Sequence, residues 1–220
     1  MGLRGGRLAT KLADAKDVLI EKGICAWSAC PYMDQLGPRE PKPVGPEPTR
    51  EADSAAAENR IVEVGSEGTF YFNCPDPKRR EPGVAKMVYN LLAKKRPVAI
   101  AIPVFYSTTD SLETNWDNPS TTNSGQIVDP VEPDWTPRDP DSPMQFPPGH
   151  AVCVIGFQPD DGEPTGGWFI FRNSRGINWA AHIDTENHEP PIVPARGYGA
   201  ISATYIERYC WEILSPVMRH

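Results

Sequence analysis

The sequence predicts an α+β fold, and three observations support this prediction. Residues 7–22 and 81–95 repeat apolar side chains at helical spacing. Residues 98–105, 151–157 and 168–171 are apolar runs rich in β-branched and aromatic side chains, which is typical of buried strands. A polar segment rich in Asp, Gly and Pro separates the last two runs and is typical of the turn between antiparallel strands. We therefore expect helices combined with an antiparallel sheet.

Each helical segment has one apolar face. In residues 7–22 this face consists of Leu8, Leu12, Ala15, Val18 and Leu19. Gly23 is placed to end the helix, because glycine readily adopts the left-handed conformation that follows many helices. In residues 81–95 the apolar face consists of Val84, Val88, Leu91 and Leu92. Between these helices, the Pro-rich residues 38–48 predict an extended linker and the Ala-rich residues 50–60 predict a short helix.

Residues 107–148 form an insertion between two predicted strands. The segment is polar, acidic and rich in Pro, and it is longer than the usual connection between elements. Because it ends near His150, it could be a lid over a substrate groove. Its abundant Pro and Asp favour the alternative of a solvated surface insertion. Trp116 and Trp135 are the apolar side chains through which such a segment could dock.

Composition narrows the classes of partner. The chain has 220 residues, of which 39% are hydrophobic, and this is enough for one sizeable core. A net charge of −7 and a pI near 5.2 make nucleic acid or an anionic membrane an unfavourable partner. No apolar run reaches the length of a membrane span, and residues 1–20 do not resemble a signal peptide.

The cysteines favour a reducing compartment. There are five of them, at positions Cys25, Cys30, Cys74, Cys153 and Cys210. An odd number without CxxC spacing is typical of reduced thiols, so a cytoplasmic location is favoured. A bridge from Cys25 or Cys30 to Cys74 stays open if the protein is secreted. Cys153 lies within an apolar run and is predicted to belong to the core.

Two polar residues stand at the ends of neighbouring predicted strands. His150 directly precedes the run 151–157, and Asn173 closely follows the run 168–171. Because the start of one antiparallel strand lies beside the end of its partner, we expect the two side chains to meet. An amide oxygen that accepts one imidazole N–H fixes the tautomer and leaves the other ring nitrogen to face a thiol. The pair is a candidate base and orienter, although a lone histidine or a turn asparagine commonly has no such role.

Around this pair the sequence resembles the papain-like cysteine peptidases, the C1 family. The resemblance rests on Gly149-His150-Ala151-Val152, on the pattern W-F-I-x-R-N-S-x-G at residues 168–176, on Trp179 and on Gly197-Tyr198-Gly199. Further upstream, three segments match the family in the same order, namely Gly5-Gly6, residues 22–32 and residues 92–102. The similarity covers most of the chain outside two insertions.

The resemblance implies a papain-like α+β fold. This fold combines an antiparallel sheet or barrel lobe with helices from an incomplete helical lobe. It implies a single peptidase domain over residues 1–220. Within that domain, residues 1–35 would be a remnant of the helical lobe, residues 36–60 a Pro/Ala-rich connection, and residues 81–220 the β lobe with the insertion.

Roles for individual residues also follow from the resemblance. His150 would be the catalytic acid and base, and Asn173 would orient it. Gly5 and Gly6 would pair with the substrate backbone, and Ala101 and Ala151 would line the main side-chain pocket. No cofactor and no metal is implied, and the two histidines of the polar stretch 182–188 receive no role.

Two features depart from the family pattern. The family carries its nucleophilic cysteine in a Q-G-x-C-G-S-C-W segment upstream of the glycine pair, and residues 1–220 contain no counterpart. Cys25 and Cys30 are interpreted as structural, because neither is directly followed by a Trp and the Pro-rich stretch after them cannot form a helix. Arg175 replaces a Trp that shields the His/Asn hydrogen bond, and its charge disfavours a protonated imidazole. Trp179 is expected to supply part of that shield.

The sequence therefore supports two hypotheses of function. In the first, the chain is the C-terminal part of a peptidase that hydrolyses peptide or protein substrates once a missing N-terminal segment or a partner chain supplies the cysteine. The chain alone is then inactive. In the second, it is a catalytically silent relative that binds a peptide or a partner protein in the groove. A transferase or amidase on the same scaffold is a third hypothesis.

Overall fold

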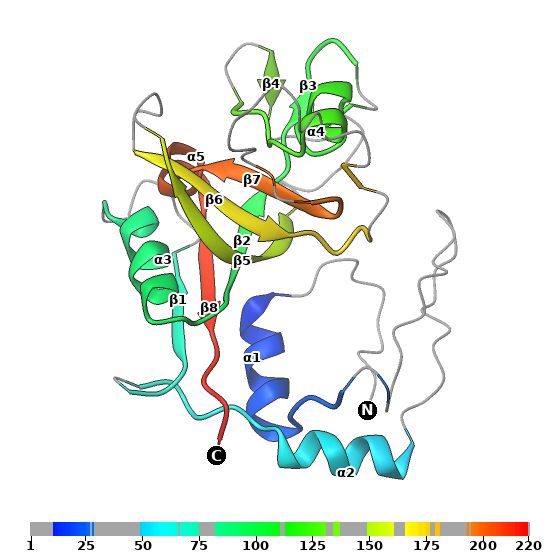
Figure 1. Ribbon diagram of the computed structural model, residues 1–220, viewed down its shortest axis with the longest axis vertical. Coiled ribbons are helices and arrows are strands. Elements are labelled where there is room, and N and C mark those ends of the chain that lie inside the picture. The colour runs from blue at the N-terminus through cyan, green and yellow to red at the C-terminus, as the bar shows by residue number, and fades with distance from the viewer. Residues whose placement is uncertain are drawn as a thin grey trace. The chain divides into compact units, whose positions relative to one another are not determined.

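The structure of the protein is a computed structural model (Figure 1), and its contacts divide the chain into two compact units. Unit 1 comprises Met1–Phe70 and Pro216–His220, and unit 2 comprises Tyr71–Ser215. The structure describes residues 11–26, 28, 49–65, 67–74, 82–110, 113–130, 134–136, 149–160, 166–176, 179–180, 193 and 195–219. The expected single domain and its inner boundaries stay a prediction.

In unit 1, helix α1 spans Leu12–Glu21 and ends as the sequence predicts. Gly23 has a φ of +83°, and its N–H donates to the carbonyl of Val18 at 3.2 Å, which closes the last turn. The predicted apolar face is only partly buried. Leu12 is buried, but 47% of Val18 is exposed, so the prediction is wrong for Val18. Residues 7–10 of the predicted helix lie outside the described residues.

Helix α2, Arg50–Glu58, confirms the predicted Ala-rich helix. The Thr49 hydroxyl accepts the N–H of Ala52 at 3.2 Å, which satisfies one of the unpaired donors of the first turn. The ends of α1 and α2 are joined by backbone hydrogen bonds, because the N–H of Ile24 donates to the carbonyl of Asn59 at 3.1 Å. The predicted linker, residues 38–48, lies outside the described residues.

Unit 2 is built on a six-stranded sheet with the strand order β1-β8-β2-β5-β6-β7. The strands are β1 (Phe70–Asn73), β2 (Val98–Pro103), β5 (Gly149–Pro159), β6 (Gly167–Arg172), β7 (Tyr198–Ser202) and β8 (Glu212–Ser215). The pairs β2–β5, β2–β8, β5–β6 and β6–β7 are all antiparallel. This sheet, together with the helices, confirms the α+β class. The barrel stays a prediction.

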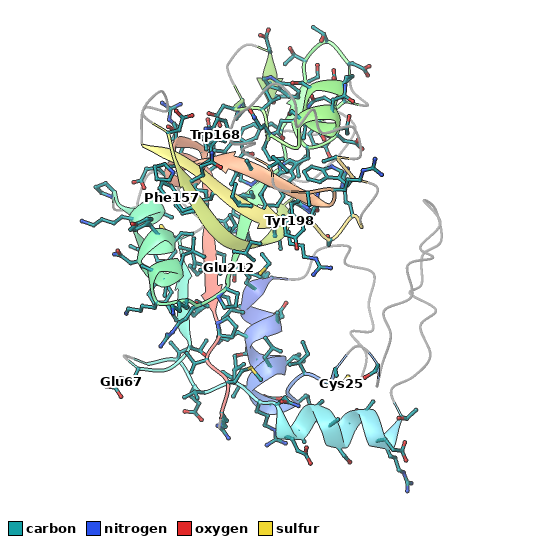
Figure 2. All side chains as sticks on the ribbon, viewed as in Figure 1. Cys25, Glu67, Phe157, Trp168, Tyr198 and Glu212 are labelled. Atoms are coloured by element: carbon teal, nitrogen blue, oxygen red, sulfur yellow. The ribbon has the colours of Figure 1, made fainter. Side chains whose placement is uncertain are left out.

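Two helices of unit 2 contact each other, and both contact the sheet. They are α3, Val84–Ala93, and α5, Ala203–Tyr209. The predicted apolar face of α3 is buried at Val84, Val88 and Leu91. From β5, Phe157 reaches this helix (Figure 2) and meets the Tyr89 ring edge-on, with 5.2 Å between the ring centroids.

The first turn of α3 receives its cap from α5. The Glu207 carboxylate accepts the backbone N–H groups of Gly83 and Ala85 at 2.6 and 2.8 Å. Such N–H groups have no partner within their own helix, so a carboxylate from elsewhere satisfies them. The contact fixes α3 against α5 and thereby sets where the following strand, β2, begins.

The described residues at the start of the insertion and within it include three short elements that the sequence did not predict. They are β3 (Tyr106–Ser107), α4 (Pro119–Ser124) and β4 (Trp135–Thr136), and β3 pairs with β4. Asn118 caps α4 by accepting the N–H of Thr121 at 2.9 Å. Trp116 is only 1% exposed, so its neighbourhood is packed onto the sheet. The interpretation as a solvated surface insertion is therefore wrong around Trp116.

Strand β5 is longer than the predicted run, and its two faces differ in burial. It starts at Gly149 and continues to Pro159. Val152 and Val154 are buried, whereas Ala151 is exposed and 49% of Ile155 is exposed. The prediction of a uniformly buried strand is wrong, because successive residues of a strand point to opposite faces of the sheet.

The described cysteines are free thiols. They are Cys25, Cys74, Cys153 and Cys210, and Cys30 lies outside the described residues. Since Cys74 is free, neither of the two possible bridges to it is formed. Cys153 is half-buried on the more exposed side of β5, so its assignment to the core is wrong. Among the described residues, no helix has the length and apolar character needed to cross a membrane.

Candidate active site

The side chains of His150 and Asn173 meet at one end of the β5–β6 pair. Cys153 of β5 pairs with Arg172 of β6, which places the next residue, Asn173, beside the first half of β5 and close to His150. His150 Nε2 and Asn173 Oδ1 are 3.0 Å apart. Because the amide oxygen can only accept, Nε2 carries the hydrogen and donates it. The predicted contact is confirmed, and the catalytic role of the pair stays a prediction.

The remaining polar atoms of the pair have distinct surroundings. No described residue forms a hydrogen bond with Nδ1 of His150, so this nitrogen keeps its lone pair when the ring is neutral. Asn173 is 6% exposed, and its backbone N–H donates to the Gly197 carbonyl at 3.0 Å. Its Nδ2 is buried without a partner in the described part of the chain. The backbone anchor therefore fixes the orienter, and Nδ1 is the nitrogen available for chemistry.

Burial lowers the pKa of His150 below that of an ordinary histidine. The hydrogen bond to Asn173 acts in the opposite direction and raises this pKa, while the positive charge of Arg175 lowers it further. The sequence-based expectation for Arg175 agrees with this direction. The site thus favours a neutral imidazole, which can accept a proton but holds it weakly.

An aromatic ring covers the imidazole, but it comes from an unexpected segment. The ring centroids of Trp116 and His150 are 4.7 Å apart at an interplanar angle of 71°. Arg175 forms an ion pair with Asp117, with 3.2 Å between Nη1 and Oδ2. Trp179, the expected partial shield, packs against Phe171 with ring centroids 5.9 Å apart. The described aromatic neighbour of His150 is therefore Trp116.

The two alanines predicted for the substrate pocket are direct partners across β2 and β5. Ala101 is 8% exposed and Ala151 is exposed. Since Ala151 is the residue after His150 on a strand, its side chain points to the opposite face of the sheet from the imidazole. The structure brings the alanines together, on the other face from His150. Their role in a pocket stays a prediction.

Other predicted residues lie apart from this pair or outside the described residues. Gly5 and Gly6, expected to bind substrate backbone, are outside them, as are His182 and His188. Cys153 lies three positions beyond His150 on β5, so its side chain points to the opposite face. In the described part of the chain, no group of three or more His, Cys, Asp or Glu side chains could hold a metal ion.

The sequence contains a signal for the ordered turn that carries Trp116 to His150. Asn118 followed by Pro119 is a typical helix start, with a capping side chain and a proline in the first turn. Recognising it would have marked Trp116 and Asp117 as part of an ordered turn. Which ring this turn would approach could not be predicted, because that depends on pairing between distant strands.

The low pKa of His150 predicts a loss of stability in acid. As the pH falls, the unfolded chain binds a proton near pH 6.5, whereas the buried imidazole binds one only at a lower pH, so protonation favours unfolding by up to about 1.4 kcal/mol per pH unit. The contribution is absent above the unfolded pKa and grows below it. We expect the free energy of unfolding to fall more between about pH 8 and about pH 5 in the wild type than in His150→Gln. Equal losses in urea titrations would contradict this expectation.

Comparison with known proteins gives structural matches but no family. No model of a protein family matches the chain, and no curated protein matches it. It is similar to a solved structure from work on the limited antibody cross-reactivity between the mite allergens Blo t 1 and Der p 1. The identity is 16% and the TM-score 0.41, over 93% of this chain and 47% of that chain. The chain thus spans about half the length of that structure. A TM-score of this size does not establish a shared fold.

Proposed function

We propose that the chain forms the histidine and asparagine side of a papain-like cysteine peptidase, with the nucleophilic cysteine supplied by another segment or chain. The carrying observation is the 3.0 Å contact between His150 Nε2 and Asn173 Oδ1 at adjacent strand ends. The contact fixes the tautomer in which Nδ1 is the acceptor. An acceptor without a partner among the described residues is what a thiol proton requires.

The proposed reaction uses Nδ1 of His150 twice. The imidazole takes the thiol proton, the thiolate attacks the peptide carbonyl carbon, and the imidazolium gives the proton to the departing amine as the C–N bond breaks. Water then attacks the thioester carbonyl carbon while His150 takes a proton from it. The C–S bond breaks, the carboxylic acid leaves, and the imidazolium returns the proton to the thiolate. Asn173 stays hydrogen-bonded to Nε2 throughout and keeps the imidazole ring in one orientation, with Nδ1 directed at the thiol.

A specific observation favours a second candidate function. A thiolate is stabilised by a neighbouring imidazolium, yet burial and Arg175 both lower the pKa of His150 and disfavour that charged form. This environment suits a silent relative that binds an extended peptide or a partner protein. Ala101 and Ala151, two small side chains paired on one face of the sheet, would leave room for the bound backbone or a side chain.

The peptidase proposal is tested on the protein in its native source form, with whatever segment or chain accompanies residues 1–220. We expect this protein to hydrolyse a fluorogenic peptide and to be labelled at one cysteine by a peptidyl electrophile. His150→Ala should lower kcat by roughly a million-fold, as loss of the base does in a serine peptidase. Peptide mapping of the label identifies the nucleophile.

The controls separate chemistry from folding. His188→Ala, a histidine to which we assign no role, should leave hydrolysis and labelling unchanged. Residues 1–220 alone should give neither hydrolysis nor labelling. If the native form shows no turnover from about pH 4 to about pH 9, where the titrating groups of such a site change charge, the peptidase proposal fails.

The binding alternative has its own test on residues 1–220. Titration with a library of unlabelled peptides should give saturable binding that Ala151→Arg abolishes, because a large cation would fill the space beside Ala101. Ile155→Arg adds the same side chain at an exposed position four residues along β5 and should leave binding unchanged. Absence of saturable binding, or equal losses in both variants, would exclude this function.

A further inference from the structure

An aromatic side chain of the insertion, Trp116, packs beside the hydrogen bond between His150 and Asn173. The Trp116 indole meets the imidazole edge-to-face, with ring centroids 4.7 Å apart. The same indole also packs against Phe171 of β6, with ring centroids 5.5 Å apart. Trp116 therefore lies against both the base and the strand that leads to Asn173. Because the indole is almost completely buried, it occupies space beside the imidazole that water would otherwise fill.

The indole is tied to the same strand end as His150. Its Nε1–H donates to the carbonyl of Pro103 at 3.3 Å. Pro103 is the last residue of β2 and pairs with Gly149, while its neighbour Ile102 pairs with His150 itself. This hydrogen bond holds the indole at β2, and β2 pairs with β5, which carries His150. The position of the indole beside the imidazole therefore does not depend on the solvent-facing parts of the insertion.

The residues on either side of Trp116 hold the turn in place. Before it, the fully buried Asn115 accepts the N–H of Phe105 at 2.9 Å and donates to the hydroxyl of Tyr205 at 3.1 Å. After it, Asp117 pairs with Arg175, which lies two residues beyond Asn173. The turn is therefore attached both to the sheet and to the loop that carries the orienter.

Exclusion of water at this point has a direct effect on the pair. A hydrogen bond is stronger where the local dielectric constant is low, and an edge-to-face ring contact restricts rotation of the imidazole. A ring held in plane keeps Nε2 directed at Asn173 and Nδ1 directed away from it. These are the properties that a base and its orienter require.

We propose that Trp116, an indole from the insertion, is a positioning residue for His150. It packs against the imidazole, holds it in its orientation toward Asn173 and excludes water from their hydrogen bond. The proposal rests on the proposed function only in that it takes the pair as base and orienter. Residues 113–118 thereby have a role in the site. The ion pair between Asp117 and Arg175 holds Trp116 near His150.

The test is nitrogen NMR of the His150 ring over a pH titration in Trp116→Leu. Leucine fills part of the space but leaves the imidazole open to water. We expect the pKa of His150 to rise toward about 6.5, its value in water. We also expect the proportion of the Nε2–H tautomer to fall, because the bond to Asn173 loosens. Arg175, whose charge lowers the pKa of His150, and its ion-pair partner Asp117 are present in all variants.

Trp135→Leu is the matched control. Trp135 lies in the same insertion on β4, is half-buried, and has no described contact with His150. It should leave the pKa and the tautomer of His150 unchanged. A structural role alone would change thermal stability in both variants without moving these two quantities. Unchanged values in folded Trp116→Leu, or equal changes in the control, would overturn the proposal.

A second variant keeps the test decisive if Trp116→Leu does not fold. Trp116→Phe retains an aromatic ring but is shorter and lacks the donor to Pro103, so a smaller rise in the pKa of His150 is expected. No rise in the folded protein would overturn the proposal. All these measurements need no turnover. If the native form shows the rise but no peptidase activity, the proposed function alone fails. If the native form has full activity without a rise, the positioning role alone fails.

Discussion

Replacing Asn115 by alanine is expected to lower the free energy of unfolding by about 3–5 kcal/mol. The Asn115 side chain is fully buried, and its Oδ1 accepts the N–H of Phe105 at 2.9 Å. Its Nδ2 donates to the Val128 carbonyl at 3.2 Å and to the Tyr205 hydroxyl at 3.1 Å. Alanine leaves the N–H of Phe105, the Tyr205 hydroxyl and the part-buried Val128 carbonyl without this partner, and a buried polar group that loses its partner costs about 1–3 kcal/mol. Urea denaturation of both proteins measures the difference.

Tyr205→Phe is the matched control for this network. It removes one hydroxyl but leaves the Pro103 carbonyl bonded to Trp116 Nε1–H at 3.3 Å, and Asn115 still has Val128. A loss of about 1 kcal/mol is expected, which is typical of a single hydrogen bond. If Asn115→Ala costs no more than Tyr205→Phe, the amide does not hold the network together.

Replacing Gly199 by alanine is expected to lower the free energy of unfolding by about 2–3 kcal/mol and to disturb the site. A Cβ at this position would lie 2.4 Å from Cζ of Phe171 and 2.7 Å from the Gly125 carbonyl oxygen. The same Cβ would lie 2.8 Å from Cη2 of Trp179. Phe171 must move to relieve the first contact, and Trp116 packs against Phe171. Thermal denaturation and the NMR signals of His150 should both change.

Gly156→Ala separates this steric effect from the general effect of a methyl group. Gly156 lies on β5, and the nearest atom to its Cβ would be Cβ of Ile170 at 3.7 Å, an ordinary contact. Neither glycine has a positive φ, so backbone strain does not enter. A change between zero and a gain of about 1 kcal/mol is expected, because alanine restricts the unfolded chain. Equal losses in the two variants would show that crowding at Gly199 is not the cause.

The parts of the fold that follow from local sequence could be predicted. The helix before Gly23 ends where expected, and the helix at residues 84–93 buries most of its predicted apolar face, although it is shorter than the predicted 81–95. The hairpin that brings His150 to Asn173 is local as well, because a polar turn joins two apolar runs. The contact between these two side chains was therefore predictable from strand order alone.

What could not be predicted depends on contacts between distant segments. The exposure of Ile155 depends on which face of β5 is covered, and a continuous apolar run gives no information about this. The position of Trp116 depends on the Pro103 carbonyl and on Tyr205, which comes from a helix near the end of the chain. The Pro-rich composition of the insertion suggested solvent, whereas buried polar groups fix its first half.

The sheet order has a consequence for folding during synthesis. Strand β8 lies between β1 and β2, and the hydroxyl of Tyr71 donates to Glu212, 141 residues later in the sequence. On the ribosome, β1 is made first among these strands and its neighbour last, so β1 waits unpaired while the rest of the sheet can assemble. Unpaired strand edges of this kind are prone to association with other chains. The slowest and most vulnerable step of biogenesis is therefore expected to be the arrival of β8, and truncations within it should cause aggregation rather than a smaller folded protein.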